Sequence, residues 1–287
     1  MRTEILKLYP DREDVTLTTY LPADSAELTR GGKRPAVLVC PGGGYTFCSD
    51  REAEPVALRF AAMGYHAFVL RYSVYKSYPV QIRETGKAFL MIREQADNWL
   101  VDTDRIALCG FSAGAHNCAL YANCWHTPVI YEFFNAQPEM FKPAAMILGY
   151  ALTDIIYMMG RERFLDGDAQ RVLAQAREVF MGKKDPDESL MAEVSPTRTV
   201  NEYTPPGFLW ATAEDTLVPV QNTLLMAQAL ADKNIPFETH IFENGVHGLS
   251  LADQATAGSP GHLNRDAARW VELAQAWLEK RFALKMT

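Results

Sequence analysis

Apolar residues in this chain gather in short runs that alternate with stretches of helical spacing. Residues 36–40 (Ala-Val-Leu-Val-Cys) and 144–150 are apolar runs of the kind found in buried parallel strands. Residues 79–100 instead repeat apolar side chains at the spacing of a helix that covers one face of a sheet. Because strands and helices alternate along the chain, the pattern predicts an α/β fold whose sheet is built from right-handed βαβ units.

The same pattern predicts the remaining elements. Two alternating stretches near the N-terminus predict an antiparallel pair at one edge of the sheet, and the last strand also alternates as an edge strand should. A short helix is predicted to end at Val194. Another is predicted to begin at Pro219, because proline is favoured at the first position of a helix. The predicted strands are 3–8, 15–21, 36–40, 65–72, 105–109, 144–150, 207–212 and 236–242, and the longer helices are 49–63, 79–100, 113–124, 168–181 and 264–284.

Residues 153–206 depart from the alternation of strands and helices. They contain a long predicted helix, a charged turn and a second short helix, and they fall between strands at the end of the sheet where ligands bind. We therefore predict that this stretch, called the cap segment below, covers the site within one domain spanning residues 1–287. A solvated excursion without a role is the alternative. The aromatic and methionine residues of the cap segment predict either an apolar pocket wall or a contact in a homo-oligomer.

Composition and charge narrow the class of protein. The chain has 287 residues, 48% of them hydrophobic, which supplies a sizeable core. Its net charge of -7 and the lack of long Lys/Arg clusters argue against nucleic acid and anionic membranes as partners. No stretch matches a signal peptide or a membrane span, so we expect a cytoplasmic protein unless a leader was removed. The five cysteines lack metal-binding spacing and are expected to be reduced and mostly buried.

The sequence Gly110-Phe-Ser-Ala-Gly114 carries the first candidate for chemistry. It reads Gly-x-Ser-x-Gly and lies between a predicted strand and a predicted helix, which is the context that a nucleophile elbow requires. The turn is sharp, so a side chain at either glycine would collide with neighbouring structure. We therefore predict that Ser112 presents an exposed nucleophilic hydroxyl.

A glycine-rich loop, Pro41-Gly-Gly-Gly-Tyr45, follows the buried strand at 36–40. It matches neither the phosphate-binding loop nor the dinucleotide fingerprint. Backbone amides at this place instead favour an oxyanion hole, formed by Gly43 and Gly44 together with the amide of Ala113, the residue after the nucleophile. A plain tight turn is the alternative.

A serine nucleophile needs a base and a group that orients the base. Of the six histidines, only His247 lies in a glycine-flanked loop directly after the final strand. Asp215 lies in the loop after the strand at 207–212, and the order Ser112, Asp215, His247 is the order of nucleophile, acid and base in α/β hydrolases. The adjacent Glu214 remains an alternative acid. The other five histidines are expected to be packed or surface imidazoles: His66, His116, His126, His240 and His262.

Together, residues 41–45, 110–114, 213–219 and 245–248 resemble the α/β-hydrolase esterases of the hormone-sensitive-lipase and acetylesterase type. The resemblance runs from about Ala36 to the C-terminus. It implies a mostly parallel eight-stranded sheet flanked by helices, an acyl-enzyme mechanism without metal or cofactor, and short-chain carboxylic esters as substrates. Bacterial members of similar size include sugar and xylan acetylesterases. The chain departs from many relatives at Pro41, where they carry histidine.

The predicted function is hydrolysis of short acyl esters, with acetylated carbohydrates as the natural class implied by the resemblance. His247 takes the proton of Ser112, Asp215 orients His247, and the amides of Gly43, Gly44 and Ala113 bind the oxyanion. A prolyl-peptidase-like or arylformamidase activity would use the same residues on an amide. A catalytically silent ligand-binding protein is the alternative from another class, although it would have no need of all three side chains.

Overall fold

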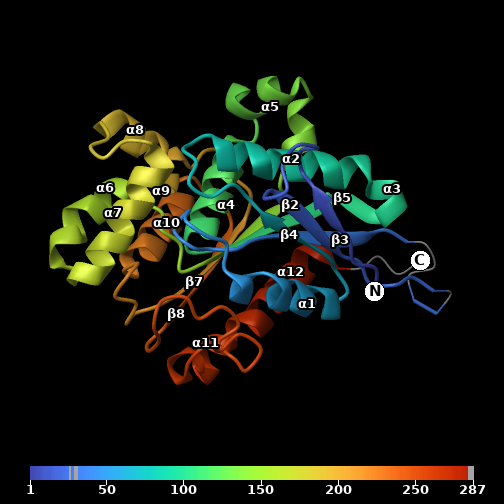
Figure 1. Ribbon diagram of the computed structural model, residues 1–287. Coiled ribbons are helices and arrows are strands. Elements are labelled where there is room, and N and C mark those ends of the chain that lie inside the picture. The colour runs from blue at the N-terminus through green and yellow to red at the C-terminus, as the bar shows by residue number, and fades with distance from the viewer. Residues whose placement is uncertain (26, 29–31, 284–287) are drawn as a thin grey trace.

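The computed structural model describes residues 1–25, 27–28 and 32–283. Its described residues build an eight-stranded sheet in the order β1-β2-β4-β3-β5-β6-β7-β8, as Figure 1 shows. β1 and β2, and β2 and β4, pair antiparallel, whereas all other neighbours are parallel. The strands are β1 Ile5–Lys7, β2 Thr16–Tyr20, β3 Arg34–Cys40, β4 His66–Arg71, β5 Val101–Phe111, β6 Ala145–Gly149, β7 Gly207–Thr212 and β8 Phe237–Phe242.

The sequence therefore predicts every strand and both edge positions of the sheet. The antiparallel pair β1–β2 lies at one edge and β8 at the other, and the mostly parallel eight-stranded sheet implied by the family resemblance is confirmed. β5 begins at Val101 and is longer than the predicted strand at 105–109. Residues 102–105 of this strand are polar and not buried, so the apolar run marks only its buried second half.

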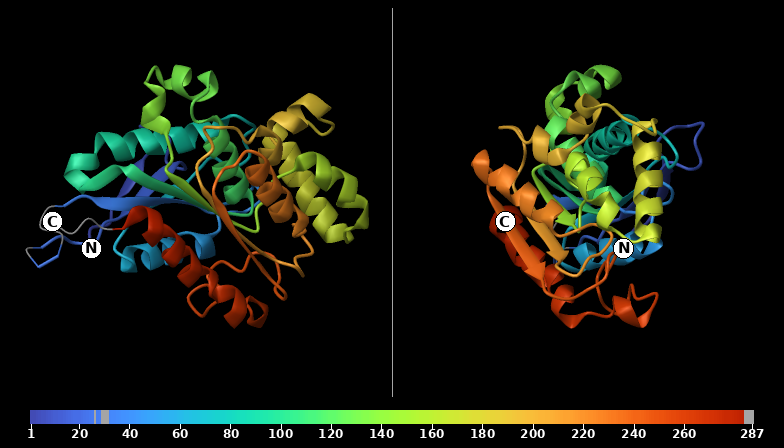
Figure 2. Two further views of the ribbon diagram at one scale, coloured as in Figure 1. Left: turned by 180° about the vertical axis from the view of Figure 1, so that it is seen from behind. Right: turned by 90° about the vertical axis from the view of Figure 1, so that its left-hand side faces the viewer.

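Side chains from the two faces of the sheet enter two separate cores. Leu38 and Cys40 of β3 belong to one core, and Val37 and Val39 belong to the other, as the two-residue period of a strand requires. Helices α2, α3, α4 and α10 pack against the first core, and α1, α11 and α12 against the second. Figure 2 shows these two groups of helices on opposite sides of the sheet. The helices outside the cap segment are α1 Glu54–Ala62, α2 Val80–Glu94, α3 Ala96–Trp99, α4 Ala113–Cys124, α5 Pro128–Phe134, α10 Gln221–Asp232, α11 Arg265–Ala268 and α12 Trp270–Phe282.

Several predicted helices begin or divide at other places than expected. The helix predicted at 49–63 is a 3₁₀ turn, η1 Asp50–Glu52, followed by α1, because Ala53 leaves the helical region with φ −104° and ψ −107°. Pro55 then stands in the first turn of α1, where its missing N–H costs nothing. The helix predicted at 79–100 divides at Gln95, and the one at 264–284 divides at Arg269; its expected last residue lies outside the described residues.

Two elements between 124 and 144 have no counterpart among the predictions. They are α5 and the 3₁₀ helix η2 Pro138–Phe141. Each starts with a proline, which the sequence pattern treats as a helix breaker but which here stands in the first turn of a helix. Conversely, Pro219 is not the first residue of the next helix, because α10 begins at Gln221 with Val220 as its N-cap.

The cap segment forms helices beyond one end of the sheet (Figure 1). It comprises α6 Ile155–Arg161, the 3₁₀ helix η3 Glu162–Phe164, α7 Gly167–Met181, α8 Glu188–Glu193 and α9 Pro196–Thr199. The predicted helices at 168–181 and up to Val194 correspond to α7 and α8. α6 and α9 are additional.

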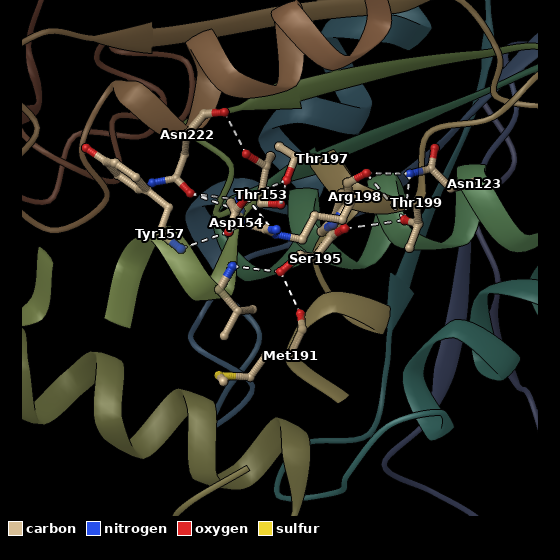
Figure 3. A network of polar contacts seen from close by, with 12 residues as sticks. Asn123, Thr153, Asp154, Tyr157, Met191, Ser195, Thr197, Arg198, Thr199 and Asn222 are labelled. Atoms are coloured by element: carbon tan, nitrogen blue, oxygen red, sulfur yellow. Dashed lines mark hydrogen bonds and ion pairs between the residues drawn. The ribbon is translucent and has the colours of Figure 1, made fainter. Parts of the chain in front are cut away.

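Both ends of the cap segment are tied to the body of the protein by buried asparagines, as Figure 3 shows. Asn222 of α10 accepts hydrogen bonds from the amides of Thr153 and Asp154 at 3.0 and 3.2 Å. Asn123 of α4 donates to the carbonyl of Pro196 at 2.9 Å. The two asparagines hold the start of the segment and its helix α9 against different body helices.

A second set of contacts joins the two ends of the cap segment to each other. Asp154 accepts hydrogen bonds from the amide of Tyr157, at 2.8 Å, and from the hydroxyl of Thr197, and it pairs with Arg198 at 3.1 Å. Ser195 accepts from the amide of Ile155 at 2.9 Å. The base of the cap segment is therefore one continuous polar network (Figure 3).

No helix among residues 1–25, 27–28 and 32–283 has the length and hydropathy needed to cross a membrane. All five cysteines are free thiols, and Cys40, Cys109 and Cys118 are buried, in agreement with the expectation of reduced, mostly buried thiols.

Candidate active site

Ser112 stands at the turn between β5 and α4, in a backbone conformation that side chains rarely adopt. Its φ is 50° and its ψ is −119°. A Cβ at Gly110 would lie 2.5 Å from the carbonyl oxygen of Gly114, and a Cβ at Gly114 would lie 2.1 Å from that of Cys40. Both positions therefore require glycine, because the helix passes so close to the ends of two strands.

His247 bridges Ser112 and Asp215. Its Nε2 lies 2.8 Å from the Ser112 Oγ, and its Nδ1 lies 2.7 Å from the Asp215 Oδ2. The Asp215 side chain is fully buried, and its other oxygen accepts hydrogen bonds from the amides of Leu217 and Val218. Since a carboxylate only accepts hydrogen bonds, Nδ1 carries the proton and Nε2 is free to accept the proton of the serine. The three side chains expected to meet are thus brought together.

Glu214 takes a different place from Asp215. Its carboxylate accepts hydrogen bonds from the Asn244 side chain at 2.8 Å and from the amide of Gly245 at 3.1 Å. It supports the turn that precedes His247, and the hydrogen bond to the imidazole comes from Asp215 instead. The geometry therefore favours Asp215 over Glu214 as the orienting acid.

None of the other five histidines hydrogen-bonds Ser112 in the described part of the chain. His116 is fully buried on α4, where its Nδ1 lies 2.5 Å from the Tyr45 hydroxyl and its Nε2 lies 2.8 Å from the carbonyl of Val194. Burial lowers the pKa of His116 to about 4, so the ring is neutral and joins the glycine loop to the cap segment. Burial likewise lowers the pKa of His66 to about 4.

Two opposing effects set the pKa of His247. Burial favours the neutral imidazole, but the negative charge of Asp215, its hydrogen bond to Nδ1 and the charge of Glu52 favour the imidazolium. The second group of effects is the stronger, so the pKa lies above the ordinary value of 6.5. The ring is therefore poised to receive a proton near neutral pH.

The glycine loop is folded tightly by hydrogen bonds to its own carbonyl groups. Gly43 accepts from the amides of Thr46 and Phe47, and a Cβ at Gly43 would lie 2.1 Å from the carbonyl oxygen of Phe47. Within the described residues no hydrogen bond uses the amide of Gly43, Gly44 or Ala113. These three residues line the same cavity as Ser112. The amides expected to form an oxyanion hole are available for one.

The cavity beside Ser112 has a volume of about 320 Å³ and is lined mostly by apolar side chains. One wall comes from the glycine loop and the residues around His247. The other comes from the cap segment, where Glu162 and Arg177 form an ion pair at 2.5 Å within the lining. The cap side chains that line it are Ile155, Met158, Met159, Glu162, Val172, Leu173, Gln175, Ala176, Arg177, Phe180 and Met181.

Glu52 and Tyr150 are parts of the site that the sequence did not reveal. Glu52 lies in η1 and is buried beneath the glycine loop, where it accepts a hydrogen bond from the amide of Gly42. The hydroxyl of Tyr150 donates to the same carboxylate, and the Tyr150 ring packs against His247 at a centroid distance of 5.0 Å. The only signal in the sequence is an acidic residue after a glycine loop, and acidic residues are ordinary at the start of a helix.

Comparison with known proteins gives one matching family model, BD-FAE, over residues 19–230. The carboxylesterase Cest-2923 of Lactobacillus plantarum is similar over the full length of both chains, with 31% identity and a TM-score of 0.84. An acetyl ester-xyloside bifunctional hydrolase of Caldicellulosiruptor lactoaceticus has 28% identity and a TM-score of 0.77, with 97% of this chain and 96% of that chain covered.

Among curated proteins, the endo-1,4-beta-xylanase B of Butyrivibrio fibrisolvens is 34% identical over 230 residues, which cover 77% of this chain and 33% of that protein. The chain spans between 33% and 58% of the length of the curated relatives it matches. Several of these relatives are named esterases. The expected α/β-hydrolase fold and the expected class of carboxylic ester hydrolases are confirmed by these similarities.

Proposed function

Because the chain belongs to the BD-FAE family of esterase-type α/β hydrolases, we propose that it is a serine carboxylesterase for short acyl esters. The observation that carries the proposal is the hydrogen-bonded series Ser112–His247–Asp215 at the wall of the cavity. The whole chain, residues 1–287, acts as one hydrolase domain in which residues 153–206 are the cap.

The reaction proceeds through an acyl-enzyme on Ser112. His247 accepts the proton of the Ser112 hydroxyl while the oxygen attacks the ester carbonyl, and Asp215 stabilises the imidazolium that forms. The tetrahedral intermediate collapses when His247 donates that proton to the departing alcohol. Water then attacks the acyl-enzyme by the same proton transfers and releases the carboxylic acid.

The amides of Gly43, Gly44 and Ala113 stabilise the negative oxygen of the tetrahedral intermediate. They are free of other hydrogen bonds within the described residues, and Ala113 is the first residue of α4, where the helix dipole favours negative charge. Fixed donors of this kind need no reorganisation during the reaction. No metal or cofactor takes part in the proposed steps.

The proposed natural substrates are acetylated carbohydrates. Support comes from the cap, whose large side chains Met158, Leu173 and Phe180 line the cavity that also contains Ser112. Further support comes from relatives that are named a xylanase, an acetylxylan esterase and an acetyl ester-xyloside hydrolase. A cavity wall just beyond a short acyl group rejects longer chains by about 1 to 3 kcal/mol per methylene.

Turnover of p-nitrophenyl acetate, butyrate and octanoate tests the proposal, together with acetate release from acetylated xylo-oligosaccharides. We expect kcat/KM to be highest for acetate or butyrate and to fall steeply for octanoate. An optimum at octanoate would contradict the short-acyl proposal, and efficient cleavage of a peptide amide or a formanilide would favour the amide-hydrolase alternative. If no ester is turned over, the silent ligand-binding alternative gains support.

A further inference from the structure

A single buried carboxylate connects the two loops that the proposed mechanism needs. Glu52 is 4% exposed, and its Oε2 accepts a hydrogen bond from the amide of Gly42 at 2.7 Å, directly before the glycine pair of the oxyanion loop. Its Oε1 accepts from the Tyr150 hydroxyl at 2.6 Å, and that hydroxyl accepts from the amide of Ser250 at 2.9 Å. Ser250 belongs to the loop that carries His247.

The turn that bears Glu52 makes a second connection to the His247 loop. The Ser250 hydroxyl donates to the carbonyl of Arg51 at 2.7 Å, and the Arg51 guanidinium donates to the carbonyl of Thr256. The loop after β3 and the loop after β8 are thus joined through η1. The break between η1 and α1 is what places Glu52 under the glycine loop instead of on a helix surface.

Tyr150 is held in this arrangement at a conformational cost. Its φ is 36°, a region that a bulky residue rarely adopts, and its amide donates to the carbonyl of Trp210 at 2.7 Å. The conformation brings the ring edge-on to His247 and points the hydroxyl at Glu52. Burial keeps the pKa of Tyr150 well above 10, so the phenol remains a donor.

The charge on Glu52 also bears on the reaction. The pKa of Glu52 lies above its ordinary value of 4.5, because burial outweighs the hydrogen bonds from Tyr150 and Gly42 and the charges of His247 and Arg51. A buried carboxylate is costly, but here both of its oxygens accept hydrogen bonds, from Gly42 and from Tyr150, and an amide side chain would offer only one acceptor. Its negative charge favours the imidazolium form of His247.

We infer that Glu52 is a positioning residue of the hydrolase, which fixes the oxyanion loop and the His247 loop in one arrangement and stabilises the His247 imidazolium through its charge. The inference rests on the proposed function. It assigns Glu52 no contact with the substrate: the carboxylate acts through Gly42 on the oxyanion amides, and through Tyr150 on the base.

Two variants of Glu52 test the charge and the length of its side chain. Glu52→Gln keeps the length of the side chain but removes the charge and one of the two hydrogen-bond acceptors, whereas Glu52→Asp keeps the charge and both acceptors and shortens the side chain by one methylene. Glu54→Gln is the matched control, because Glu54 lies two residues away on α1, is exposed, and accepts a hydrogen bond from Tyr20, and neither residue lines the cavity.

We expect Glu52→Gln to lower kcat for p-nitrophenyl acetate by roughly 10- to 100-fold, the scale of a small misplacement of catalytic groups. KM should stay within about threefold, because no ground-state contact is removed. The midpoint of the acidic limb of the rate profile should move to lower pH by about half a unit, because His247 loses a stabilising negative charge. Glu52→Asp should lower kcat and keep the midpoint of the wild-type protein.

The charged and titratable groups around His247 define what else could move the midpoint. They are Asp215, which hydrogen-bonds the ring, Tyr150, which packs against it, Glu52, whose charge favours the imidazolium, Arg51, whose charge acts on Glu52, and Glu214, which holds Gly245. All except Glu52 are unchanged in Glu52→Gln. A midpoint that stays in place or rises, or a kcat within about twofold of wild type, would overturn the inference.

The same comparison can be made without an ester substrate, by measuring the rate at which a fluorophosphonate labels Ser112 in the wild-type protein and in Glu52→Gln. If the wild-type protein is labelled but turns over no ester, the proposed function fails while the effect of Glu52 on the labelling rate and its pH dependence can still be measured. If Glu52→Gln does not fold, Tyr150→Phe takes its place, with Tyr20→Phe as its control, since each removes one phenol that donates to a glutamate. Equal kcat for these two tyrosine variants would also contradict the inference.

Discussion

The two walls of the cavity are built by different parts of the chain and held in different ways. The body wall carries Ser112, Asp215 and His247, each in a loop directly after a parallel strand, and the strand residues before them in β5 and β7 are buried. The cap wall stands on α6 and α7, whose buried residues are few, and α8 has none.

The contacts that support the two walls differ in the same way. In the body, the important side chains are held by buried hydrogen bonds, such as those of Asp215 to two amides. In the outer part of the cap, ion pairs such as Lys183–Asp187 and Arg171–Asp168 are largely exposed. Exposed pairs contribute between 0 and about 1 kcal/mol, so these two pairs add little to the stability of the outer cap.

The two walls therefore suit two different requirements, the precise placement of reacting groups and the choice among substrates. The chemistry proposed at Ser112 requires atoms held to a fraction of an ångström, which the strand ends provide. Selection among substrates requires only the right volume, and cap side chains can change without moving the reacting groups. We therefore expect body substitutions to change kcat and cap substitutions to change the preference among substrates.

The largest effect is expected for Ser112→Ala. Removal of the nucleophile should lower kcat by about 10⁴ or more and leave the fold intact, as seen when members of such a triad are removed. Ester hydrolysis and the circular dichroism spectrum of the variant measure both parts. Stoichiometric labelling of the wild-type protein by a fluorophosphonate at a serine other than Ser112 would refute the assignment.

Asp215→Asn should be nearly as damaging to turnover, by about 10³ to 10⁴ in kcat, because the amide no longer selects the tautomer in which Nε2 accepts a proton. Substrate binding should be retained. Glu214→Gln is the matched comparison and should cost far less, since Glu214 holds only the turn at Gly245. The reverse order of the two variants would show that the acid has been misassigned.

The pH dependence of kcat/KM should follow the titration of His247. The base must be neutral in order to act, and its pKa lies above 6.5, so activity should be full above that pKa and should fall as the pH drops through it. The fall should be about tenfold per pH unit, or roughly 100-fold over two units. A midpoint clearly below 6.5 would contradict the contribution of Asp215 and Glu52.

Substitutions at the base of the cap should lower the free energy of unfolding more than substitutions in its outer part. Asn222→Ala leaves the amides of Thr153 and Asp154 without a partner and should lower the free energy of unfolding by about 2 to 4 kcal/mol. Lys183→Ala, in an exposed ion pair, should lower it by less than about 1 kcal/mol. Denaturant unfolding of both variants measures the difference, and equal losses would show that the base network is not a special anchor.

The smallest effect is expected for a cap side chain in the cavity. Leu173→Ala should raise kcat/KM for octanoate relative to acetate by roughly tenfold, because it enlarges the cavity by about three methylene groups. The value for acetate itself should change little. Arg171→Ala, on the exposed side of the same helix, serves as the control and should leave the ratio unaltered.

Much of the body wall could be predicted because its residues follow a rule of the fold. Parallel strands end at the same edge of a sheet, so Ser112, Asp215 and His247 meet although they are far apart in the sequence. The glycines around Ser112 and the loop at Gly43 carry local signatures, since only glycine fits there. Each of these features can be recognised from a few neighbouring residues.

Glu52 and the helix divisions could not be predicted, because they depend on partners distant in the chain. Glu52 contacts Tyr150, 98 residues away, and nothing in residues 49–63 distinguishes it from an ordinary acidic residue in the first turn of a helix. α5 was not predicted because its first residue, Pro128, is a helix-breaking residue unless the start of the helix is already known. The volume of the cavity depends on side-chain packing between the cap and the body, which has no sequence pattern.

The asparagine anchors of the cap determine where related enzymes can be recombined. Asn123 and Asn222 lie on α4 and α10, outside the cap segment, but their partners Thr153, Asp154 and Pro196 lie within it. A chimaera whose crossovers fall at the strand ends would import foreign partners for both asparagines. Crossovers inside the anchors, after Asp154 and before Ser195, would place a new cap wall on a body in which the contacts of Ser112, Asp215 and His247 are unchanged.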